Sequence, residues 1–137
     1  MNFRLAQPSD DGPIMDLFNH IPVEGSWKIR YMKSPSYLDA LKLQGHQTFT
    51  LVGEKNGKIM AVVSAVYQKV WVKNLCLTVG YITDVRVYPD HRSGFALRKG
   101  IKTMEEISMQ QKAHFHYATL IDDNSLTKKV FGANRPG

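Results

Sequence analysis

The chain has 137 residues, 43% of them hydrophobic and 22% charged, which is typical of one globular domain and excludes a wholly disordered chain. No apolar run approaches the roughly 18 residues of a membrane span, and the single cysteine, Cys76, excludes an internal disulfide or a cysteine-based metal cage. The formal net charge of +6 suits an anionic small-molecule ligand or a solvated basic surface, but the basic residues are too scattered to predict nucleic-acid binding.

The first third of the chain predicts a short strand and two helices. Residues 3–6 favour a strand, and Ser9 can cap the helix that follows. Apolar residues of that helix repeat at the i, i+3, i+4 spacing: Ile14, Leu17 and Phe18. Residues 22–36 predict a loop because prolines and a glycine interrupt them, and residues 34–43 predict a second helix.

Three consecutive strands are predicted next. Residues 48–52 are rich in β-forming types, and Asn56-Gly57 is the dipeptide most typical of a two-residue hairpin turn. The apolar run 59–66 begins the second strand of this hairpin. Residues 75–88 then alternate between a mostly apolar face and a more polar one, which predicts a long third strand.

The remaining pattern is helical, then extended, then helical. Residues 95–111 predict a long amphipathic helix, residues 115–121 a strand, and Asp123 or Asn124 can cap a last helix. A strand, a crossover helix and a further strand place two strands in parallel. We therefore predict a single domain over residues 1–137, of the α/β (α+β) class, with a mixed, mostly antiparallel central sheet and helices on both faces.

The junction between the long strand and the long helix is the segment most informative about function. The strand ends at Pro89, a short loop with Arg92, Ser93 and Gly94 follows, and the helix begins at once. The first turn of a helix leaves backbone N–H groups without internal partners and carries a partial positive charge. The junction therefore predicts an anion or phosphate site, with a simple strand-to-helix turn as the alternative.

The junction also carries a spaced pattern of residues: Val85, Val87, Pro89, His91-Arg92, Gly94 and Ala96. It resembles the central motif of the GNAT acyltransferase superfamily, in which alternating valines precede Pro, then Gln or Arg, then Gly and Gly or Ala at the head of a helix. If Arg92 is the basic residue, the loop is one residue short before Gly94. If the glycine keeps its place, His91 stands where Gln or Arg is usual. The order of elements resembles that family over nearly the whole chain.

The resemblance implies an acyl-CoA N-acyltransferase fold with acetyl-CoA or a related acyl-CoA as co-substrate. The pantetheine arm would pair with the exposed backbone of the long strand, and the pyrophosphate would cap the helix that follows. The residues implied in this binding are Val85, Arg86, Val87, Arg92, Ser93, Gly94, Phe95, Ala96, Leu97 and Asn124. The amine attacks the thioester directly in such proteins, so Cys76 need not act as a nucleophile.

Asp84 is the predicted catalytic residue, as the base for the acceptor amine or as its binding group. The alternative is an acid at a strand end that pairs with Arg86 or with a lysine. Trp27 and Tyr31, together with Tyr37, lie where the family shapes the acceptor pocket, and an aromatic wall can hold a cationic amine. Packing of helix and loop is the alternative for these aromatic residues.

Two positions bear on the remaining chemistry. Phe131 stands where many family members carry a tyrosine that protonates the leaving thiolate, so another group must do this or the domain is a weak or inactive catalyst. His114 and His116 share one face of a strand, but no third ligand is evident, so no metal site is predicted.

The sequence thus predicts an N-acetyltransferase that acts on a small-molecule or peptide amine, with a non-catalytic CoA-binding module or a basic interaction module as alternatives. We expect no membrane partner and, because no secretory signal is evident, a cytoplasmic location. The family usually has two further strands after the last helix. We expect these to be missing here. Either a further C-terminal segment of a longer protein or a second copy in a homodimer supplies them, or the fold is natively shortened and leaves an open sheet edge.

Overall fold

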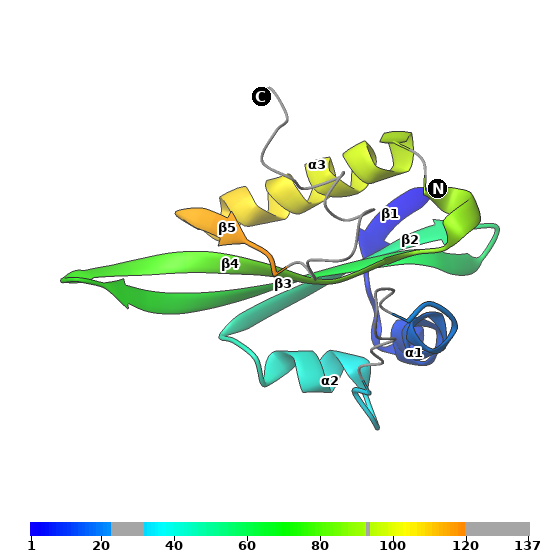
Figure 1. Ribbon diagram of the computed structural model, residues 1–137, viewed down its shortest axis with the longest axis horizontal. Coiled ribbons are helices and arrows are strands. Elements are labelled where there is room, and N and C mark those ends of the chain that lie inside the picture. The colour runs from blue at the N-terminus through cyan, green and yellow to red at the C-terminus, as the bar shows by residue number, and fades with distance from the viewer. Residues whose placement is uncertain (23–31, 93, 120–137) are drawn as a thin grey trace.

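The computed structural model describes residues 1–22, 32–92 and 94–119, which form a sheet with helices on both of its faces (Figure 1). The strands lie in the order β1-β2-β3-β4-β5. The elements are β1 (Asn2–Leu5), α1 (Asp11–His20), α2 (Tyr37–Lys42), β2 (Gln47–Lys55), β3 (Lys58–Val72), β4 (Leu75–Val87), α3 (Gly94–Gln110) and β5 (Phe115–Tyr117), with 3₁₀ turns at Pro8–Asp10 and Pro89–His91.

The predicted mixed sheet is confirmed. The first four strands pair in antiparallel fashion, each with its sequence neighbour. The pair β4–β5 is parallel, because helix α3 carries the chain back across the sheet between them. The register of this pair aligns Val79 with Phe115 and Tyr81 with Tyr117.

The tight turn between β2 and β3 follows from its sequence. Asn56 and Gly57 both have positive φ, of 53° and 72°, which is the requirement of a type I′ turn. Lys55 and Lys58 pair directly across this turn. The predicted Asn-Gly hairpin is therefore confirmed.

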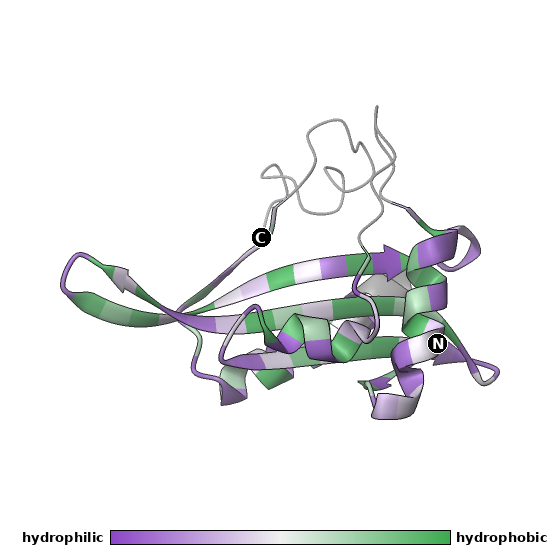
Figure 2. Ribbon diagram, turned by 90° about the horizontal axis from the view of Figure 1, so that it is seen from below, coloured by the Kyte–Doolittle hydropathy of each residue, from purple (hydrophilic) through white to green (hydrophobic). Residues whose placement is uncertain are grey.

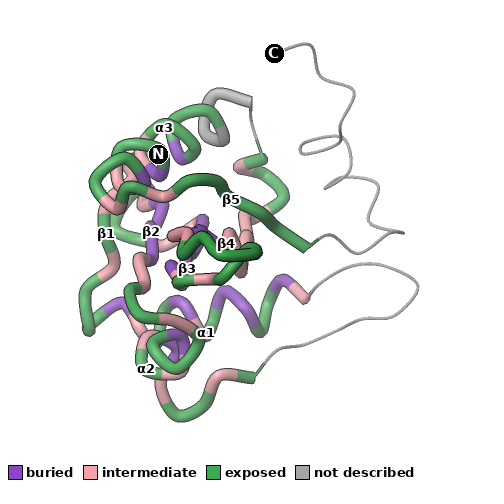
Figure 3. Tube along the Cα trace, turned by 90° about the vertical axis from the view of Figure 1, so that its left-hand side faces the viewer, coloured by how far each residue is buried: buried purple, intermediate pink, exposed green. Residues whose placement is uncertain are grey.

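Two apolar layers hold the helices against the sheet. Helices α1 and α2 cover one face and α3 the other (Figure 1). The cluster under α1 and α2 consists of Ile14, Leu17, Phe18, Ile21, Tyr37, Leu41, Val52, Val62 and Val66. The cluster under α3 is smaller and consists of Leu51, Ala65, Tyr67 and Met104. Burial is concentrated on the central strands and on the inward side of the helices (Figure 3).

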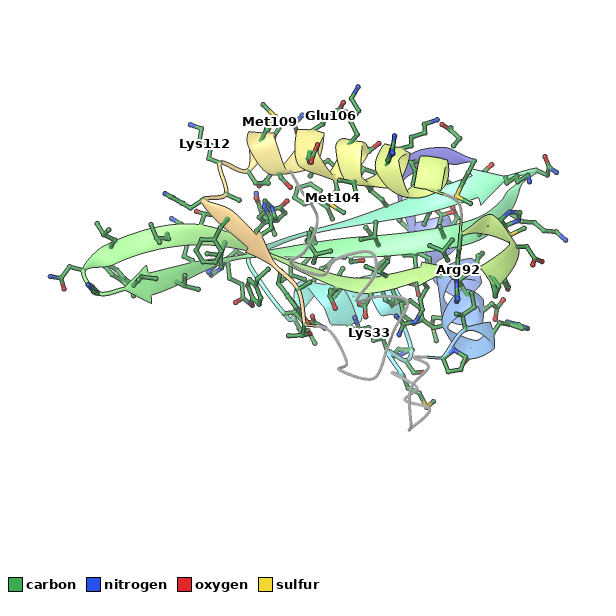
Figure 4. All side chains as sticks on the ribbon, turned by 45° about the horizontal axis from the view of Figure 1, so that its top comes forward. Lys33, Arg92, Met104, Glu106, Met109 and Lys112 are labelled. Atoms are coloured by element: carbon green, nitrogen blue, oxygen red, sulfur yellow. The ribbon has the colours of Figure 1, made fainter. Side chains whose placement is uncertain are left out.

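Helix α3 shows the amphipathic character that its sequence predicts. Met104 points toward the sheet and is 6% exposed, whereas Met109 points away and is 79% exposed (Figure 4). Glu106 and Lys112 lie on the outer side of this layer (Figure 4). The buried Ser108 satisfies its hydroxyl by hydrogen bonding to the Tyr67 phenol, at 2.7 Å between the two oxygens.

The β3–β4 ribbon projects beyond the rest of the sheet. Strand β2 pairs with β3 only as far as Tyr67, and β5 pairs with β4 only from Val79 onward. Residues 69–72 and 75–78 therefore form a two-stranded extension (Figure 1). The apolar stretches of the strands continue into it (Figure 2). Three of its large apolar side chains are exposed: Trp71, Val72 and Leu75.

Gly80 on β4 permits a close approach of β5. A Cβ atom at this position would lie 2.3 Å from Cδ2 of His116 and 3.1 Å from Cε1 of Tyr67. We expect Gly80→Ala to lower the free energy of unfolding by about 1–3 kcal/mol, the usual cost of overpacking. Urea unfolding of this variant measures the effect.

Gly12→Ala is the matched control for Gly80→Ala. Gly12 lies in the first turn of α1, where an added Cβ would meet no atom within 4 Å. Alanine in a helix is favoured over glycine by up to about 1 kcal/mol. The control should therefore be neutral or stabilising, and an equal loss in both variants would contradict the packing argument.

Some predicted boundaries differ from the observed ones. Helix α2 begins at Tyr37 rather than near residue 34, because Ser36 is the residue whose side chain caps it, accepting from the Asp39 amide at 3.2 Å. Strand β5 ends at Tyr117 rather than at residue 121. The predicted last helix falls within residues 120–137, which lie outside the described residues, and the two missing strands would follow it. Both expectations stay predictions.

Candidate active site

A β-bulge interrupts β4 near its end. Val62 pairs with Arg86 and Ser64 pairs with Thr83, so Asp84 and Val85 together stand opposite the single residue Val63. Asp84 has a φ of 58°, in the left-handed region that aspartate tolerates better than most residues. Such a bulge bends a strand and redirects a side chain. Here it directs the Asp84 carboxylate to the face of the sheet that α1 and α2 cover.

The Asp84 carboxylate is held by two groups, one from the segment before α2 and one from the first residue of α2. The ammonium of Lys33 forms an ion pair with its Oδ2, and the phenol of Tyr37 donates a hydrogen bond to the same oxygen at 3.0 Å. The side chains of Asp84 and Lys33 are only 8% and 14% exposed. The pair is therefore largely removed from water, where electrostatic interactions are stronger than at a surface.

A chain of hydroxyl groups continues from this carboxylate into the sheet. Tyr37 Oη lies 2.7 Å from Ser64 Oγ, which lies 2.8 Å from Thr50 Oγ1. The phenol has one proton and gives it to Asp84, so Ser64 must donate to Tyr37 and Thr50 to Ser64. The hydroxyl groups of Tyr37, Ser64 and Thr50 therefore all donate in the direction of the Asp84 carboxylate. Such an aligned series strengthens each of its hydrogen bonds.

Tyr37 remains a proton donor in this setting. Burial, followed by the negative charge of Asp84, raises the pKa of Tyr37 far above its ordinary value. Its ring also lies 4.8 Å from Lys33 Nζ, a cation–π distance, and stacks against Phe18 at 5.2 Å between ring centroids. The Asp84 carboxylate and the face of the Tyr37 ring thus both lie against one primary ammonium group.

The outer edge of β4 is open beside the bulge. Strand β5 pairs with β4 only from Val79 to Tyr81, and among the described residues no strand pairs with this edge after Tyr81. The two strands separate at a stack of Tyr81 on Tyr117, with centroids 4.9 Å apart, and Tyr81 Oη also hydrogen bonds Thr119 at 2.7 Å. Within the described residues, this edge of β4 near the bulge is therefore not covered by another strand.

Two arginine side chains fold back onto carbonyl groups of this segment. Arg86 Nη1 donates to the Val85 carbonyl at 2.8 Å, and Arg92 Nε donates to the Val87 carbonyl at 3.0 Å. Arg92 follows the 3₁₀ turn Pro89–His91 and is exposed, two residues before the first residue of α3. In the sequence, Arg92 therefore comes just before the positive end of a 17-residue helix, and Figure 4 shows where its side chain lies.

The structure brings part of the predicted site together. Asp84, Val85, Arg86, Val87 and Arg92 follow one another along the open segment and the turn. The Arg86 side chain points toward the end of α1, where Nε donates to the carbonyl of residue 21 at 3.1 Å and the guanidinium lies 5.1 Å from the ring of residue 18. Because its side chain is directed to α1, Arg86 would contact a ligand at the β4 edge through its main-chain groups.

The other predicted positions lie in the first turn of α3 or outside the described residues. Gly94 begins α3, and the structure describes Phe95, Ala96 and Leu97 by their backbone alone. The remaining predicted residues lie outside the described residues: Trp27, Tyr31, Ser93, Asn124 and Phe131.

The sequence interpretation missed three residues of the Asp84 cluster. Ser64 and Thr50 are fully or nearly buried polar residues, and each stands within an apolar strand run, which is a recognisable signal. Lys33 precedes α2 in a stretch without periodicity, so nothing in the sequence indicates its partner. The predicted alternative of a pairing between Asp84 and a lysine is the one observed.

Two further features lie apart from the Asp84 cluster. An open hollow of about 290 Å³ lies beside the turn and includes neither Asp84 nor Lys33. Its lining residues are Lys58, Ile59, Met60, Tyr88, Asp90 and His91. Burial lowers the pKa of His116, whose Nε2 lies 3.4 Å from Tyr67 Oη.

Two further findings concern the described part of the chain. Within residues 1–22, 32–92 and 94–119, no three His, Cys, Asp or Glu side chains gather into a set that could hold a metal ion. Of the helices in the same ranges, none combines the length and the apolar character that crossing a membrane requires.

Comparison of the sequence with known families finds no family model that matches. Comparison with curated proteins finds no match.

Solved structures with a similar fold are numerous. A predicted acetyltransferase from Clostridium acetobutylicum, solved with acetyl-CoA, is 17% identical with a TM-score of 0.69, covering 98% of this chain and 90% of its own. Glucosamine-6-phosphate N-acetyltransferase from Arabidopsis thaliana is 18% identical with a TM-score of 0.69, covering 99% and 92%. A transcriptional regulator from Bacillus halodurans C-125 is 13% identical with a TM-score of 0.67, covering 99% and 95%.

These structures confirm the predicted fold. The chain has the α/β fold of the GNAT acetyltransferases over nearly its whole length. The similarity to a transcriptional regulator illustrates that one fold can serve different functions. Function must therefore be argued from the site.

Proposed function

We propose that this chain transfers an acetyl or related acyl group from acyl-CoA to a primary amine by direct attack. The observation that carries the proposal is the position of Asp84. Its carboxylate already holds a primary ammonium, and it does so at the bulge where β4 has lost its partner on β5. A site for an amine and an open backbone edge for a thioester chain thus lie on the same few residues.

The open segment of β4 and the turn after it are the proposed acyl-CoA site. The pantetheine arm would pair with the backbone from Ile82 to Val87, as an extra strand does. The exposed guanidinium of Arg92 and the first N–H groups of α3 would bind the pyrophosphate. Ser93 and Asn124 are proposed as further contacts.

Asp84 is the proposed base. The carboxylate can hold the ammonium form of the acceptor and take a proton from it, which makes the nitrogen nucleophilic. The donated hydrogen bond from Tyr37 would keep the carboxylate in place during this transfer. Backbone N–H groups of the open edge are the donors available to the thioester oxygen as negative charge develops on it.

The acceptor is proposed as a small-molecule or peptide amine. The aromatic face of Tyr37, which already lies against an ammonium, supports a cationic acceptor. Trp27 and Tyr31 are proposed as further acceptor contacts. A cytoplasmic location, and the completion of the sheet by a second copy or a further segment, remain predictions.

Titration calorimetry of acetyl-CoA into the purified chain tests the binding half of the proposal. We expect saturable binding that Arg92→Glu weakens by about tenfold or more, because a charged hydrogen bond contributes about 1.5–3 kcal/mol and the new carboxylate repels phosphate. Lys69→Glu makes the same charge change on the projecting ribbon, at an exposed position that pairs with Thr78.

The control should keep the affinity of the parent chain. Equal weakening by Arg92→Glu and Lys69→Glu would show a general charge effect rather than a site at the turn. Absence of saturable binding at high acetyl-CoA concentration would contradict the proposal itself.

A second function is favoured by one observation. Lys33 occupies the carboxylate that the acceptor amine would use, so the domain could bind acyl-CoA without acting on an external amine. A non-catalytic acyl-CoA-binding module would then show stabilisation by acetyl-CoA in a thermal melt but no release of free CoA thiol with any amine tested. Release of thiol that depends on an added amine would exclude this alternative.

A further inference from the structure

The ion pair between Lys33 and Asp84 differs from the other lysine–carboxylate pair in the described part of the chain. Lys42 and Asp39 lie 2.7 Å apart on the surface of α2, with side chains 67% and 73% exposed. The Lys33 ammonium instead reaches from the segment before α2 to the bulge of β4, where its side chain is 14% exposed. Figure 4 shows Lys33 on the α2 side of the sheet.

The environment of Lys33 Nζ matches what an acceptor amine needs. It contacts a carboxylate that can take its proton, and it lies 4.8 Å from the Tyr37 ring centroid. An amine that its own chain holds in position reacts faster than one that must first diffuse to the site. For well-oriented groups this advantage corresponds to effective molarities of about 10⁵–10⁸ M. If the proposed acyl-CoA site is correct, the Lys33 amine therefore already lies at the bulge where the thioester would be placed.

We propose that Lys33 is itself an acyl acceptor, so that the chain acylates its own Lys33 side chain. This inference rests on the proposed function. The Lys33 ammonium gives one proton to Asp84, and the freed nitrogen attacks the thioester carbonyl. The new N–C bond forms, the C–S bond breaks, and the sulfur leaves as the thiol of CoA with the second proton of the nitrogen. The proton on Asp84 passes to solvent.

The product has a different charge from the starting chain. Acylation turns the ammonium into a neutral amide, which removes the ion pair with Asp84. One acyl group is consumed for each chain, and the Lys33 nitrogen cannot react again. The reaction is therefore stoichiometric and site-specific, which distinguishes it from turnover on a free amine.

Intact-mass measurement before and after incubation of the full chain with acetyl-CoA, without added amine, tests this inference. We expect the chain either to carry the mass of one acetyl group before the incubation or to gain it during the incubation. Peptide mapping should place this group on Lys33. Lys33→Arg keeps a cation for Asp84 and should lose this mass gain. The matched variant Lys42→Arg should keep it.

Asp84→Asn provides a second readout, since it should slow the modification of Lys33 by about 100-fold or more. Circular dichroism of each variant shows whether it is folded. Because acetyl-CoA can also modify exposed lysines without catalysis, the same incubation is repeated on the chain unfolded in urea. Equal acetylation of Lys33 and Lys42 in the folded chain, or equal rates in the folded and unfolded chains, would overturn the inference.

The result also separates this inference from the proposed function. If acetyl-CoA binds and an added amine is acetylated while Lys33 stays unmodified, self-acylation is wrong and the proposed function stands. If acetyl-CoA does not bind at all, both are wrong.

Discussion

Asp84→Asn should lower kcat/KM for the acetylation of an added amine by about 10²–10⁴-fold, the usual contribution of a general base. An amide cannot accept the proton of the ammonium, and it has no charge with which to hold it. Acetyl-CoA binding should persist, because the Asp84 side chain contacts Tyr37 of α2 and Lys33 before it, whereas the proposed acyl-CoA site uses the open edge and the turn. Steady-state release of CoA thiol, beside calorimetry of acetyl-CoA, measures the two effects separately.

Asp39→Asn is the control for this variant, because it removes a carboxylate that also pairs with a lysine, but at an exposed position. Its kcat/KM should stay within about a factor of two of the parent value, as expected for a surface change. Full activity of Asp84→Asn would show that the carboxylate neither takes the proton nor holds the acceptor. Loss of acetyl-CoA binding together with activity would indicate instead that the bulge has changed shape.

Local chemistry explains why much of the fold could be predicted. Asn56-Gly57 specifies its turn because both residues need positive φ, and the period-two pattern of residues 75–88 matches the observed β4 almost to its end. The change of period after Pro89 correctly predicts α3 and, with it, the parallel pair β4–β5. Each of these features depends on residues close together in the sequence.

The central contacts of the site depend on residues far apart in the sequence. Lys33 and Asp84 are separated by 51 positions, and Tyr37 and Asp84 by 47. Strict alternation would continue through Asp84, but the bulge adds one residue to β4, and no sequence pattern marks it. Asp84 could be predicted from its position in a sequence motif. Its partners could not, because only the folded chain brings Lys33 and Tyr37 to β4.

Lys33→Met should lower the free energy of unfolding by about 3–5 kcal/mol, because it leaves a carboxylate that is 8% exposed without its cation. Lys42→Met removes a cation from an exposed pair and should cost about 1 kcal/mol or less. Urea unfolding at constant pH and salt measures both variants. Similar losses in the two would show that the Lys33–Asp84 pair behaves as a surface pair.

The double variant Lys33→Met with Asp84→Asn completes a thermodynamic cycle. Because an uncharged amide does not need a cationic partner, the double variant should lose less stability than the sum of the two single losses, with a coupling of about 1–3 kcal/mol. Additive losses would mean that each side chain acts through its own packing. Acylation of Lys33 removes the same charge as the methionine does, so a chain acylated at Lys33 should unfold at lower urea concentration than the unmodified chain. Stability thus reports on the same ion pair that the proposed chemistry would consume.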